Sequence, residues 1–449
     1  MKGLMIGVSG VRGIVGMGLN PEVVLRLGQA FGTYLEGGRV IVGMDTRTSG
    51  PMIKSALISG LLSTGCKVID LGISTTPTLQ IMVEELKADG GIVISGSHNP
   101  SEWNALKFVR DDGIFLNANE AKELLNIYWQ GSFLQAKWNE IHEVEKFENS
   151  SEIHISKVLK ILDLDLIRKR KFRVAIDCCN GAGSIITPEF LKELGCDVIE
   201  IHTTPNGFFP HNPEPTFVNL GEISERTVSS GCDIGFAQDA DADRCAIITE
   251  NGEILSEEYT LTIVSDYVLS YKKGPVVCNL STTRMMDEVT KRHNVELVRT
   301  PVGEVNVSEK MKEIGSVIGG EGNGGVIDPR VHYGRDSFVA IGLILEYMAK
   351  ECKKISEIVK KFPRYYIDKR KIEFPRRRMK DLISYYKEKF KDEKINLDDG
   401  IRIDAEDFWI HIRMSGTEPV LRVIVESRSK KKTEEIVNKL LVEIEEMKG

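Results

Sequence analysis

Ser97 lies in a stretch whose residue types suit nucleophilic chemistry. Residues 90–100 read GGIVISGSHNP, in which the β-branched run 92–94 predicts a buried strand that empties into small and polar residues. Small residues let the backbone turn tightly, so we expect the hydroxyl to stand exposed at the end of a rigid strand. Lys107 follows after one loop and could bring a positive charge beside it. By itself the stretch is also typical of an ordinary Ser/Asn/Pro turn.

Three carboxylates, Asp239, Asp241 and Asp243, stand two residues apart between two strand-like segments. On an extended backbone such side chains point to one side, so we expect them to converge. Converging like charges are costly without a cation, and Mg²⁺ prefers a few carboxylates with a phosphate oxygen. The spacing to Glu250 also imitates a calcium-binding EF-hand, but Arg244 occupies its glycine position. The triplet therefore predicts a magnesium site, with a solvated acidic turn as the alternative.

A glycine-rich loop in the third quarter of the chain carries groups suited to a sugar. Glycines at 319–325 leave Glu321 and Asn323 free to project from the end of a strand. A carboxylate and an amide are suitable partners for adjacent sugar hydroxyls. A flexible glycine loop without a ligand is the alternative.

Two arginine-containing turns are suited to an anion. Near the C-terminus, Arg413, Ser415 and Thr417 share one turn, where backbone amides complete a possible phosphate cradle. Near the N-terminus, Arg12 lies in the glycine-rich segment 7–13, where the backbone can approach a phosphate closely. The alternative for Arg12 is a surface arginine beside a glycine turn.

The segments between these loops alternate between strand and helix patterns. Residues 39–42 and 68–71 read as strands, and residues 51–65 between them have helical spacing. The alternation restarts at 172–177 and again near residue 256. It predicts α/β domains, whose sheets bind ligands at the carboxyl ends of their strands.

A partial dinucleotide-binding pattern occurs in the second of these units. Gly181 and Gly183 follow a predicted strand, and Glu200 comes about twenty residues later. Ile186 occupies the place of the third glycine. We therefore interpret the segment as a structural turn.

Composition divides the chain into four expected domains. A polar stretch near residue 150 suggests the first boundary, and a basic run at 369–378, interpreted as a solvated charged face, opens the last domain. The expected domains are 1–150, 151–253, 254–366 and 367–449.

Overall composition excludes several classes of partner. Of 449 residues, 59 are Lys or Arg and 66 are Asp or Glu, a net charge of −7 that argues against nucleic acid or an anionic membrane as partner. No apolar segment reaches the ~18 residues of a membrane span, and the N-terminus shows no signal-peptide pattern. The eight cysteines lack CxxC spacing, which suggests a reducing compartment. We expect a cytoplasmic protein.

Four motifs occur in order, one in each expected domain. They are residues 97–100 (SHNP), 239–244 (DADADR), 320–324 (GEGNG) and 413–419 (RMSGTEP). Over its whole length the chain resembles the α-D-phosphohexomutase superfamily. The resemblance implies a four-domain, heart-shaped α/β protein around a central cleft. Three related mixed α/β/α domains would precede a C-terminal α+β domain of the TATA-box-binding-protein-like type.

The resemblance also implies roles for individual residues. Ser97 corresponds to the phosphoserine that carries the transferred phosphoryl group. The implied catalytic set is Ser97, His98, Lys107, Arg244, Arg12 and Glu304. The implied Mg²⁺ ligands are Ser97, Asp239, Asp241 and Asp243. The implied substrate-binding set is Glu321, Asn323, Arg413, Ser415, Gly416, Thr417 and Arg422.

Several positions depart from the family pattern. Ser95 and Gly96 stand where Thr-Ala is more usual, and Ala105 stands where a glycine is expected. Gly325 replaces a histidine that ends the sugar loop in many relatives. Glu304, at a place where relatives carry histidine or aspartate, becomes the expected proton-transfer group.

The implied activity is interconversion of hexose 6-phosphate and hexose 1-phosphate through a bisphosphorylated sugar, with a sugar 1,6-bisphosphate as activator. The segments 102–107, 302–307 and 320–325 are most similar to phosphoglucosamine mutases. The alternatives are phosphomannomutase or phosphoglucomutase activity, or a catalytically silent sugar-phosphate binding protein. A monomer or a homodimer is expected.

Overall fold

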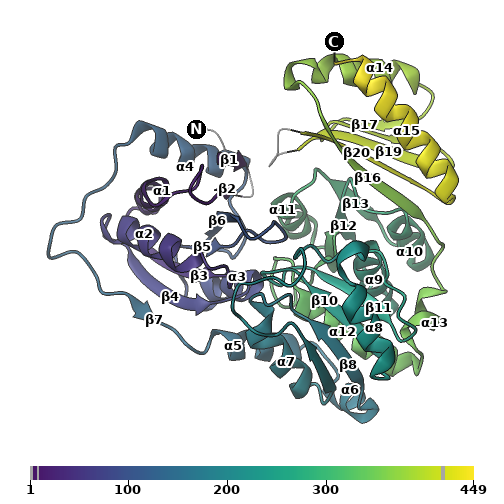
Figure 1. The fold of residues 1–449 in the computed structure, drawn as a ribbon, viewed down its shortest axis with the longest axis horizontal. Coiled ribbons are helices and arrows are strands. Elements are labelled where there is room, and N and C mark those ends of the chain that lie inside the picture. Colours follow the sequence, from purple (N-terminus) through teal and green to yellow (C-terminus); the bar gives the residue numbers. More distant parts are fainter. Residues whose placement is uncertain (1–3, 8–9, 416–419, 449) are drawn as a thin grey trace.

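The computed structural model describes residues 4–7, 10–415 and 420–448. The strands in these ranges form four sheets that follow one another along the chain. Figure 1 shows the first body at the left, the second and third side by side, and the last one at the top.

The first sheet has seven strands in the order β1-β2-β6-β5-β3-β4-β7. Its central strands are apolar on both faces: Val40 and Val42 pack with α1 and α2, while Ile41 between them packs with α3. Such two-sided burial is typical of parallel strands covered by helices. The strands are β1 (Leu4–Gly7), β2 (Gly10–Ile14), β3 (Arg39–Met44), β4 (Lys67–Ile73), β5 (Gly90–Ile94), β6 (Trp103–Arg110) and β7 (Glu145–Lys146). The helices are α1 (Pro21–Tyr34), α2 (Gly50–Leu62), α3 (Thr76–Glu85) and α4 (Ala118–Gln130).

The second and third sheets have four strands each, in the orders β11-β10-β8-β9 and β13-β12-β14-β15. The second unit contains α5 (Ser150–Leu159), α6 (Leu164–Arg170), β8 (Arg173–Asp177), α7 (Gly183–Glu193), β9 (Asp197–Ile201), η1 (Phe217–Asn219), α8 (Gly221–Ser229), β10 (Ile234–Gln238) and β11 (Cys245–Thr249). The third contains α9 (Glu258–Tyr271), β12 (Val276–Asn279), α10 (Met285–His293), β13 (Leu297–Thr300), α11 (Glu304–Ile314), β14 (Ile318–Glu321), β15 (Gly325–Ile327), α12 (Ser337–Glu351) and α13 (Ile355–Val359).

One arrangement of four strands recurs in all three sheets. Three parallel strands end in an antiparallel hairpin: β4-β3-β5 with β6, β9-β8-β10 with β11, and β13-β12-β14 with β15. The loops of these hairpins are residues 95–102, 239–244 and 322–324, which contain or adjoin the first three motifs. Equivalent turns of three related units therefore carry the serine, the aspartates and the sugar-loop residues.

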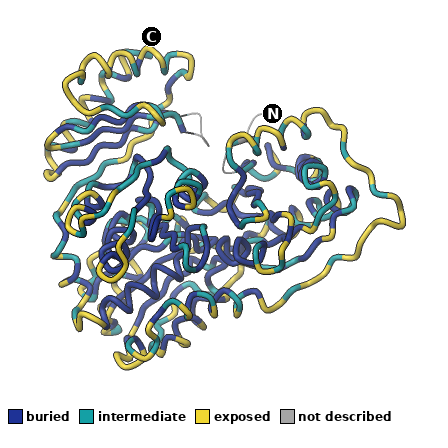
Figure 2. The backbone as a smooth tube through the Cα atoms, turned by 180° about the vertical axis from the view of Figure 1, so that it is seen from behind, coloured by how far each residue is buried: buried dark blue, intermediate teal, exposed yellow. Residues whose placement is uncertain are grey.

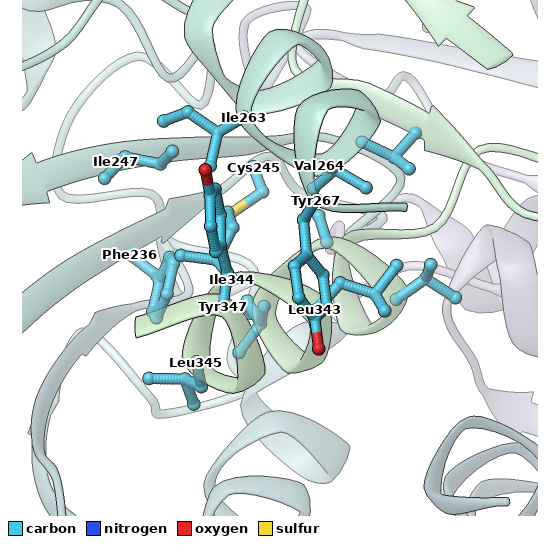
Figure 3. Close-up of a cluster of buried hydrophobic side chains, with 14 of the residues drawn as sticks. Phe236, Cys245, Ile247, Ile263, Val264, Tyr267, Leu343, Ile344, Leu345 and Tyr347 are labelled. Atoms are coloured by element: carbon cyan, nitrogen blue, oxygen red, sulfur yellow. The ribbon is translucent and has the colours of Figure 1, made fainter. Parts of the chain in front are cut away.

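The second and third units share one hydrophobic core. Helix α12 is buried at every position from Ser337 to Ala349, as expected of a helix that is apolar on all sides. Figure 3 shows its leucine and isoleucine side chains between β10 and β11 of the second unit and α9 of the third. The rings of Tyr267 and Tyr347 stack there with centroids 4.9 Å apart. This continuous packing fixes the second and third hairpin loops relative to each other.

The last unit is an antiparallel five-stranded sheet in the order β16-β20-β19-β18-β17, with its own core formed with two helices. Its elements are β16 (Tyr366–Glu373), η2 (Arg376–Arg378), α14 (Met379–Lys389), β17 (Lys394–Asn396), β18 (Ile401–Asp404), β19 (Phe408–Met414), β20 (Val420–Ser427) and α15 (Lys430–Glu446). Three mixed α/β units followed by an α+β unit confirm the expected four-domain fold.

Figure 2 shows buried backbone concentrated in the sheets and their covering helices. The connection from α4 to β7, residues 131–144, is mostly exposed. Within the described ranges, no helix has the length and apolar character needed to cross a membrane.

Candidate active site

The hairpin loops of the first three units and three strands of the last unit, β16, β19 and β20, border one cavity of about 360 Å³. Among its lining residues are most of those singled out in the sequence: Arg12, Ser97, His98, Lys107, Arg244, Glu304, Glu321, Asn323, Arg413, Ser415 and Arg422. Two other expected residues, Gly416 and Thr417, lie outside the described residues.

Ser97 occupies the wall of this cavity but is only 2% exposed, so the expectation of an exposed hydroxyl is wrong. Its Oγ donates a hydrogen bond to Oδ2 of Asp239 at 2.7 Å, and Nδ1 of His98 lies 3.3 Å away. Its φ of +50° is a left-handed conformation that costs a non-glycine residue about 1–3 kcal/mol. Such strain persists only where neighbours hold the backbone in place.

Arg47 is the neighbour that holds the serine loop. Its guanidinium donates to three carbonyl oxygens, those of Ser97 (2.7 Å), Asn99 (2.6 Å) and Pro100 (2.6 Å). Asp45 fixes the guanidinium in turn through a buried ion pair of 3.0 Å. This clamp follows β3 and was missed in the sequence, since an Asp-x-Arg segment after a strand is not distinctive.

The clamp also accounts for one departure from the family pattern. A Cβ at position 96 would lie 2.8 Å from the guanidinium carbon of Arg47 and 2.9 Å from the carbonyl oxygen of Trp103. Alanine at this position would require the loop to move. Gly96 therefore lets the serine loop approach the arginine closely.

The three aspartates converge as expected, but not on an extended backbone. Residues 240–242 form a turn in which Ala242 has a φ of +54°, and its amide donates to the carbonyl oxygen of Asp239. Carboxylate oxygens of all three aspartates lie within 4.8 Å of one another, and all three residues are fully buried. The turn, rather than strand alternation, brings the charges together.

The electrostatics of the triplet fit a divalent cation with oxygen ligands. Burial and the charges of Asp243 and Asp241 raise the pKa of Asp239 well above its usual value. In the described part of the chain, Oδ1 of Asp241 and Oδ1 of Asp243 are buried without a hydrogen-bond partner. Buried oxygens of this kind are costly unless an ion or water satisfies them. A hard cation such as Mg²⁺ would satisfy both.

Positive groups surround the serine and the aspartates. Nζ of Lys107 lies 2.5 Å from Oδ2 of Asp241. Burial would raise the pKa of Asp241, but this contact holds it well below its usual value. Nε of Arg244 lies 3.6 Å from Asp243 and 3.9 Å from Asp239. Burial, together with the charges of Arg244 and Arg12, lowers the pKa of His98 well below its usual value. His98 is therefore a neutral imidazole near pH 7.

Arg335 connects the aspartate triplet to the glycine-rich loop 319–325, and sequence reasoning missed it as well. Its guanidinium contacts Asp243 at 2.5 Å, Glu304 at 2.9 Å and Glu321 at 2.8 Å. Burial raises the pKa of Glu304 despite this partner. Burial would also raise the pKa of Glu321, but Arg335 and the side chain of Asn279 hold it below its usual value. An isolated arginine before a helix carries no pattern that would reveal this role.

The last unit contributes cations to the open side of the cavity. Arg413 and Arg422 are paired across β19 and β20, and Nε of Arg413 donates to Asp399 at 2.7 Å. Lys369, part of the basic run interpreted as a solvated face, is exposed as expected, but its Nζ also lies 2.9 Å from both Glu257 and Glu258. These glutamates lie at the start of α9. Lys369 therefore connects the last unit to the third.

Comparison with known proteins agrees with this arrangement. Residues 3–135, 152–252 and 256–366 match α/β/α domains I, II and III of phosphoglucomutase/phosphomannomutase, and residues 371–441 match its C-terminal domain.

Two relatives align over 442 residues. The chain is 41% identical to a phosphoglucomutase/phosphomannomutase of Thermococcus kodakarensis, with 96% of each chain covered. It is 38% identical to a probable phosphoglucosamine mutase of Pyrococcus abyssi, with 97% of each covered. The structure superposes with a TM-score of 0.86 on a phosphoglucomutase/phosphomannomutase family protein from Burkholderia thailandensis, at 25% identity, covering 99% of this chain and 98% of that one. With four motifs around one cavity and matches along nearly its whole length, the chain belongs to the α-D-phosphohexomutase superfamily.

Proposed function

We propose that this protein is a phosphohexomutase that interconverts hexose 6-phosphate and hexose 1-phosphate through a phosphorylated Ser97 and a bisphosphorylated sugar. The observation that carries the proposal is the position of the Ser97 hydroxyl. It is hydrogen-bonded to Asp239 of the buried acidic cluster and lies on a cavity bordered by all four units. In this proposal the domains are a phosphoserine domain (1–150), a metal-binding domain (151–253), a sugar-binding domain (254–366) and a phosphate-binding domain (367–449).

Mg²⁺ would be held by Asp239, Asp241, Asp243 and the phosphate on Ser97. Bound there, it would neutralise charge on the transferring phosphoryl group, which is the main requirement of such a transfer. Lys107 and Arg244 add fixed positive charge on the same side of the cavity. Arg12 donates to the side chain of Asn99 and so supports the serine loop.

The substrate hydroxyl must lose a proton when it takes the phosphoryl group from Ser97. Lys107 is unsuited to accept that proton because its ammonium is paired with Asp241. Glu304 on the cavity is suited to accept it, because burial raises the pKa of its carboxyl group. His98 also lines the cavity, but burial and the charges of Arg244 and Arg12 lower its pKa and make its imidazole a weaker acceptor. In this first step the Ser97 oxygen takes up a proton as its bond to phosphorus breaks. On the return step Ser97 gives up its proton as it takes the other phosphate, and the freed sugar oxygen receives one.

Two phosphate positions must be served in turn, because the bisphosphorylated intermediate returns its other phosphate to Ser97. We assign the grip on the non-transferring phosphate to Arg413, Ser415, Gly416, Thr417 and Arg422. Glu321 and Asn323 would contact sugar hydroxyls between this grip and the serine. A free sugar 1,6-bisphosphate would activate the enzyme by phosphorylating Ser97.

For the substrate we propose glucosamine 6-phosphate, converted to glucosamine 1-phosphate. The segments around 102–107 and 302–307, and the name of the Pyrococcus abyssi relative, support this choice. Phosphoglucomutase/phosphomannomutase activity is the second candidate, favoured by the name of the Thermococcus kodakarensis relative. A monomer or homodimer in the cytoplasm stays a prediction.

A coupled assay on the 6-phosphates of glucosamine, glucose and mannose, with Ser97→Ala as control, tests the proposal. We expect the highest kcat/KM with the glucosamine compound and no turnover by the variant. A higher kcat/KM with glucose or mannose would replace the substrate assignment. Full activity of Ser97→Ala would refute the mechanism, and binding without turnover on any substrate would favour a silent binding protein.

A further inference from the structure

A second cluster of metal-ligating side chains lies in the metal-binding unit, apart from the aspartate triplet. Oδ2 of Asp177, at the end of β8, is 3.1 Å from Nδ1 of His202 and 3.1 Å from Nε2 of His211. In the described ranges, this cluster and the triplet are the two groups whose three ligand atoms lie within 4.8 Å of one another. Asp177 is buried, and the two imidazoles keep about one-sixth of their side-chain surface exposed.

The outer nitrogen of each imidazole faces an acceptor. Nδ1 of His211 lies 2.8 Å from the carbonyl oxygen of Asn212, and Nε2 of His202 lies 3.2 Å from Oε2 of Glu222. Histidine ligands of metals characteristically donate their second N–H to a carbonyl or a carboxylate in this way, which leaves the other nitrogen's lone pair for the metal. Both rings therefore present the inner nitrogen toward one point beside Asp177.

The two rings crowd a single carboxylate oxygen. Their centroids lie 5.5 Å apart, and both inner nitrogens lie 3.1 Å from Oδ2 of Asp177. A divalent ion beside this oxygen could take both inner nitrogens and the carboxylate as ligands while the outer contacts stay in place.

The local backbone is also held in unfavourable conformations. Cys179, Asn180 and His202 have φ values of +43°, +56° and +48°. Left-handed non-glycine residues of this kind cluster where a ligand or a tight site stabilises them. The amide of Cys179 donates to Oδ1 of Asp177 at 2.8 Å, which orients the carboxylate toward the imidazoles.

We propose that Asp177, His202 and His211 bind a divalent transition-metal ion of the Zn²⁺ class, with water completing the coordination. Imidazole nitrogen favours Zn²⁺ over Mg²⁺, whereas the all-oxygen triplet favours Mg²⁺. The two sites therefore select different metals. The inference does not depend on the proposed mutase activity.

The ion would act on the loop that carries His211. Glu214, Pro215 and Thr216 of this loop line the cavity of the candidate active site. The same loop packs on the serine clamp, since the guanidinium of Arg47 stacks on Phe209 at 4.8 Å. At the other side of the cluster, Thr46 donates to the carbonyl oxygen of Asn180 at 2.8 Å. Metal at the cluster would thus fix one wall of the cavity.

The test uses the full-length protein, stripped with a chelator and dialysed against Zn²⁺ in excess Mg²⁺ at about pH 8, where imidazole is deprotonated more readily. Metal content is measured for the wild type, His211→Gln and His202→Gln. Two matched controls are His142→Gln, which changes an exposed histidine, and Asp239→Asn, which changes the oxygen triplet. Thermal unfolding checks that each variant is folded.

We expect one Zn²⁺ per chain in the wild type and in both controls, and affinity lowered by more than about 100-fold in His211→Gln and His202→Gln. No retained Zn²⁺ in the wild type, or equal retention in the two histidine variants, would overturn the proposal. Loss of the ion in Asp239→Asn alone would also overturn it, because the ion would then sit in the triplet. X-ray absorption on the loaded wild type needs no variant: it should show imidazole ligands, and oxygen ligands alone would refute the site.

Discussion

Arg47 offers a way to disturb the serine loop without touching the cavity. It does not line the cavity, yet its guanidinium supplies the three bonds that hold the carbonyl oxygens of Ser97, Asn99 and Pro100. In Arg47→Lys, the positive charge beside Asp45 remains, but one ammonium cannot span Asp45 and three carbonyl groups. We expect at least two of the three bonds to be lost.

The size of the effect follows from comparing restraint with strain. A hydrogen bond to a charged group contributes about 1.5–3 kcal/mol, so losing two removes about 3–6 kcal/mol of restraint from the loop. The left-handed conformation of Ser97 costs about 1–3 kcal/mol. The one remaining hydrogen bond contributes about 1.5–3 kcal/mol, which is too little to hold the loop firmly against that strain. If the loop relaxes, the reactive conformation falls in population by about 5- to 150-fold, since 1.36 kcal/mol is tenfold.

Steady-state kinetics of the mutase reaction measure this directly. For Arg47→Lys we expect kcat lower by about 5- to 150-fold and KM within about twofold, because the grip on the substrate is untouched. Arg39→Lys is the matched control: Arg39 lies at the start of β3, the strand that the clamp follows, and its guanidinium makes one exposed bond to the carbonyl oxygen of Leu86. A folded Arg47→Lys with wild-type kcat, or one whose loss appears in KM alone, would refute the role assigned to the clamp.

Three further predictions concern charge. Burial and like charges raise the pKa of Asp239, so its ionised form destabilises the metal-free protein above the pKa that this group has in the unfolded chain. Asp239→Asn should therefore raise the Tm of the metal-free protein by about 2–4 °C at pH 7 and abolish stabilisation by Mg²⁺. An unchanged Mg²⁺ response in thermal scans would contradict the metal site. Arg335→Met leaves three buried carboxylates without their cation and should lower the free energy of urea unfolding by about 3–5 kcal/mol. The control Arg364→Met breaks a surface ion pair and should lower it by less than about 1 kcal/mol. Equal losses in the two variants would refute the role of Arg335 in joining these carboxylates. Burial would raise the pKa of Asp336, but the imidazoles of His154 and His332 hold it below its usual value. The contribution of Asp336 to stability is therefore present above about pH 4 and is lost as the pH falls. Between about pH 5 and pH 3 the wild type should lose more unfolding free energy than Asp336→Asn, and parallel curves of unfolding free energy against pH would contradict this.

The sequence predicted the parts of the site that are written in short, contiguous motifs. Ser97 and the aspartates follow recognisable strands and Glu321 ends one. The recurring hairpins place Ser97 and Glu321 on one cavity, with Asp239 hydrogen-bonded to the serine. The backbone conformation of these loops was harder to predict from the sequence. The aspartates meet through a turn at Ala242 and not on a strand. The sequence does not indicate this turn, because alanine is rarely found in the left-handed conformation.

Isolated residues whose roles depend on tertiary packing were not predictable. Arg335 and Lys369 reach the site across unit boundaries, and only the folded arrangement shows which carboxylates they meet. The same holds for His211, which lies 34 residues from Asp177 in sequence and 3.1 Å away in space.

The most direct test of the central claim is the location of the phosphoryl group. The full-length protein is incubated with Mg²⁺ and glucose 1,6-bisphosphate, and its phosphopeptides are mapped by mass spectrometry. The account predicts one phosphoryl group on Ser97, released when hexose monophosphate is added, and none on Ser97→Ala. A phosphoryl group on another residue, or turnover without phosphorylated Ser97, would contradict it.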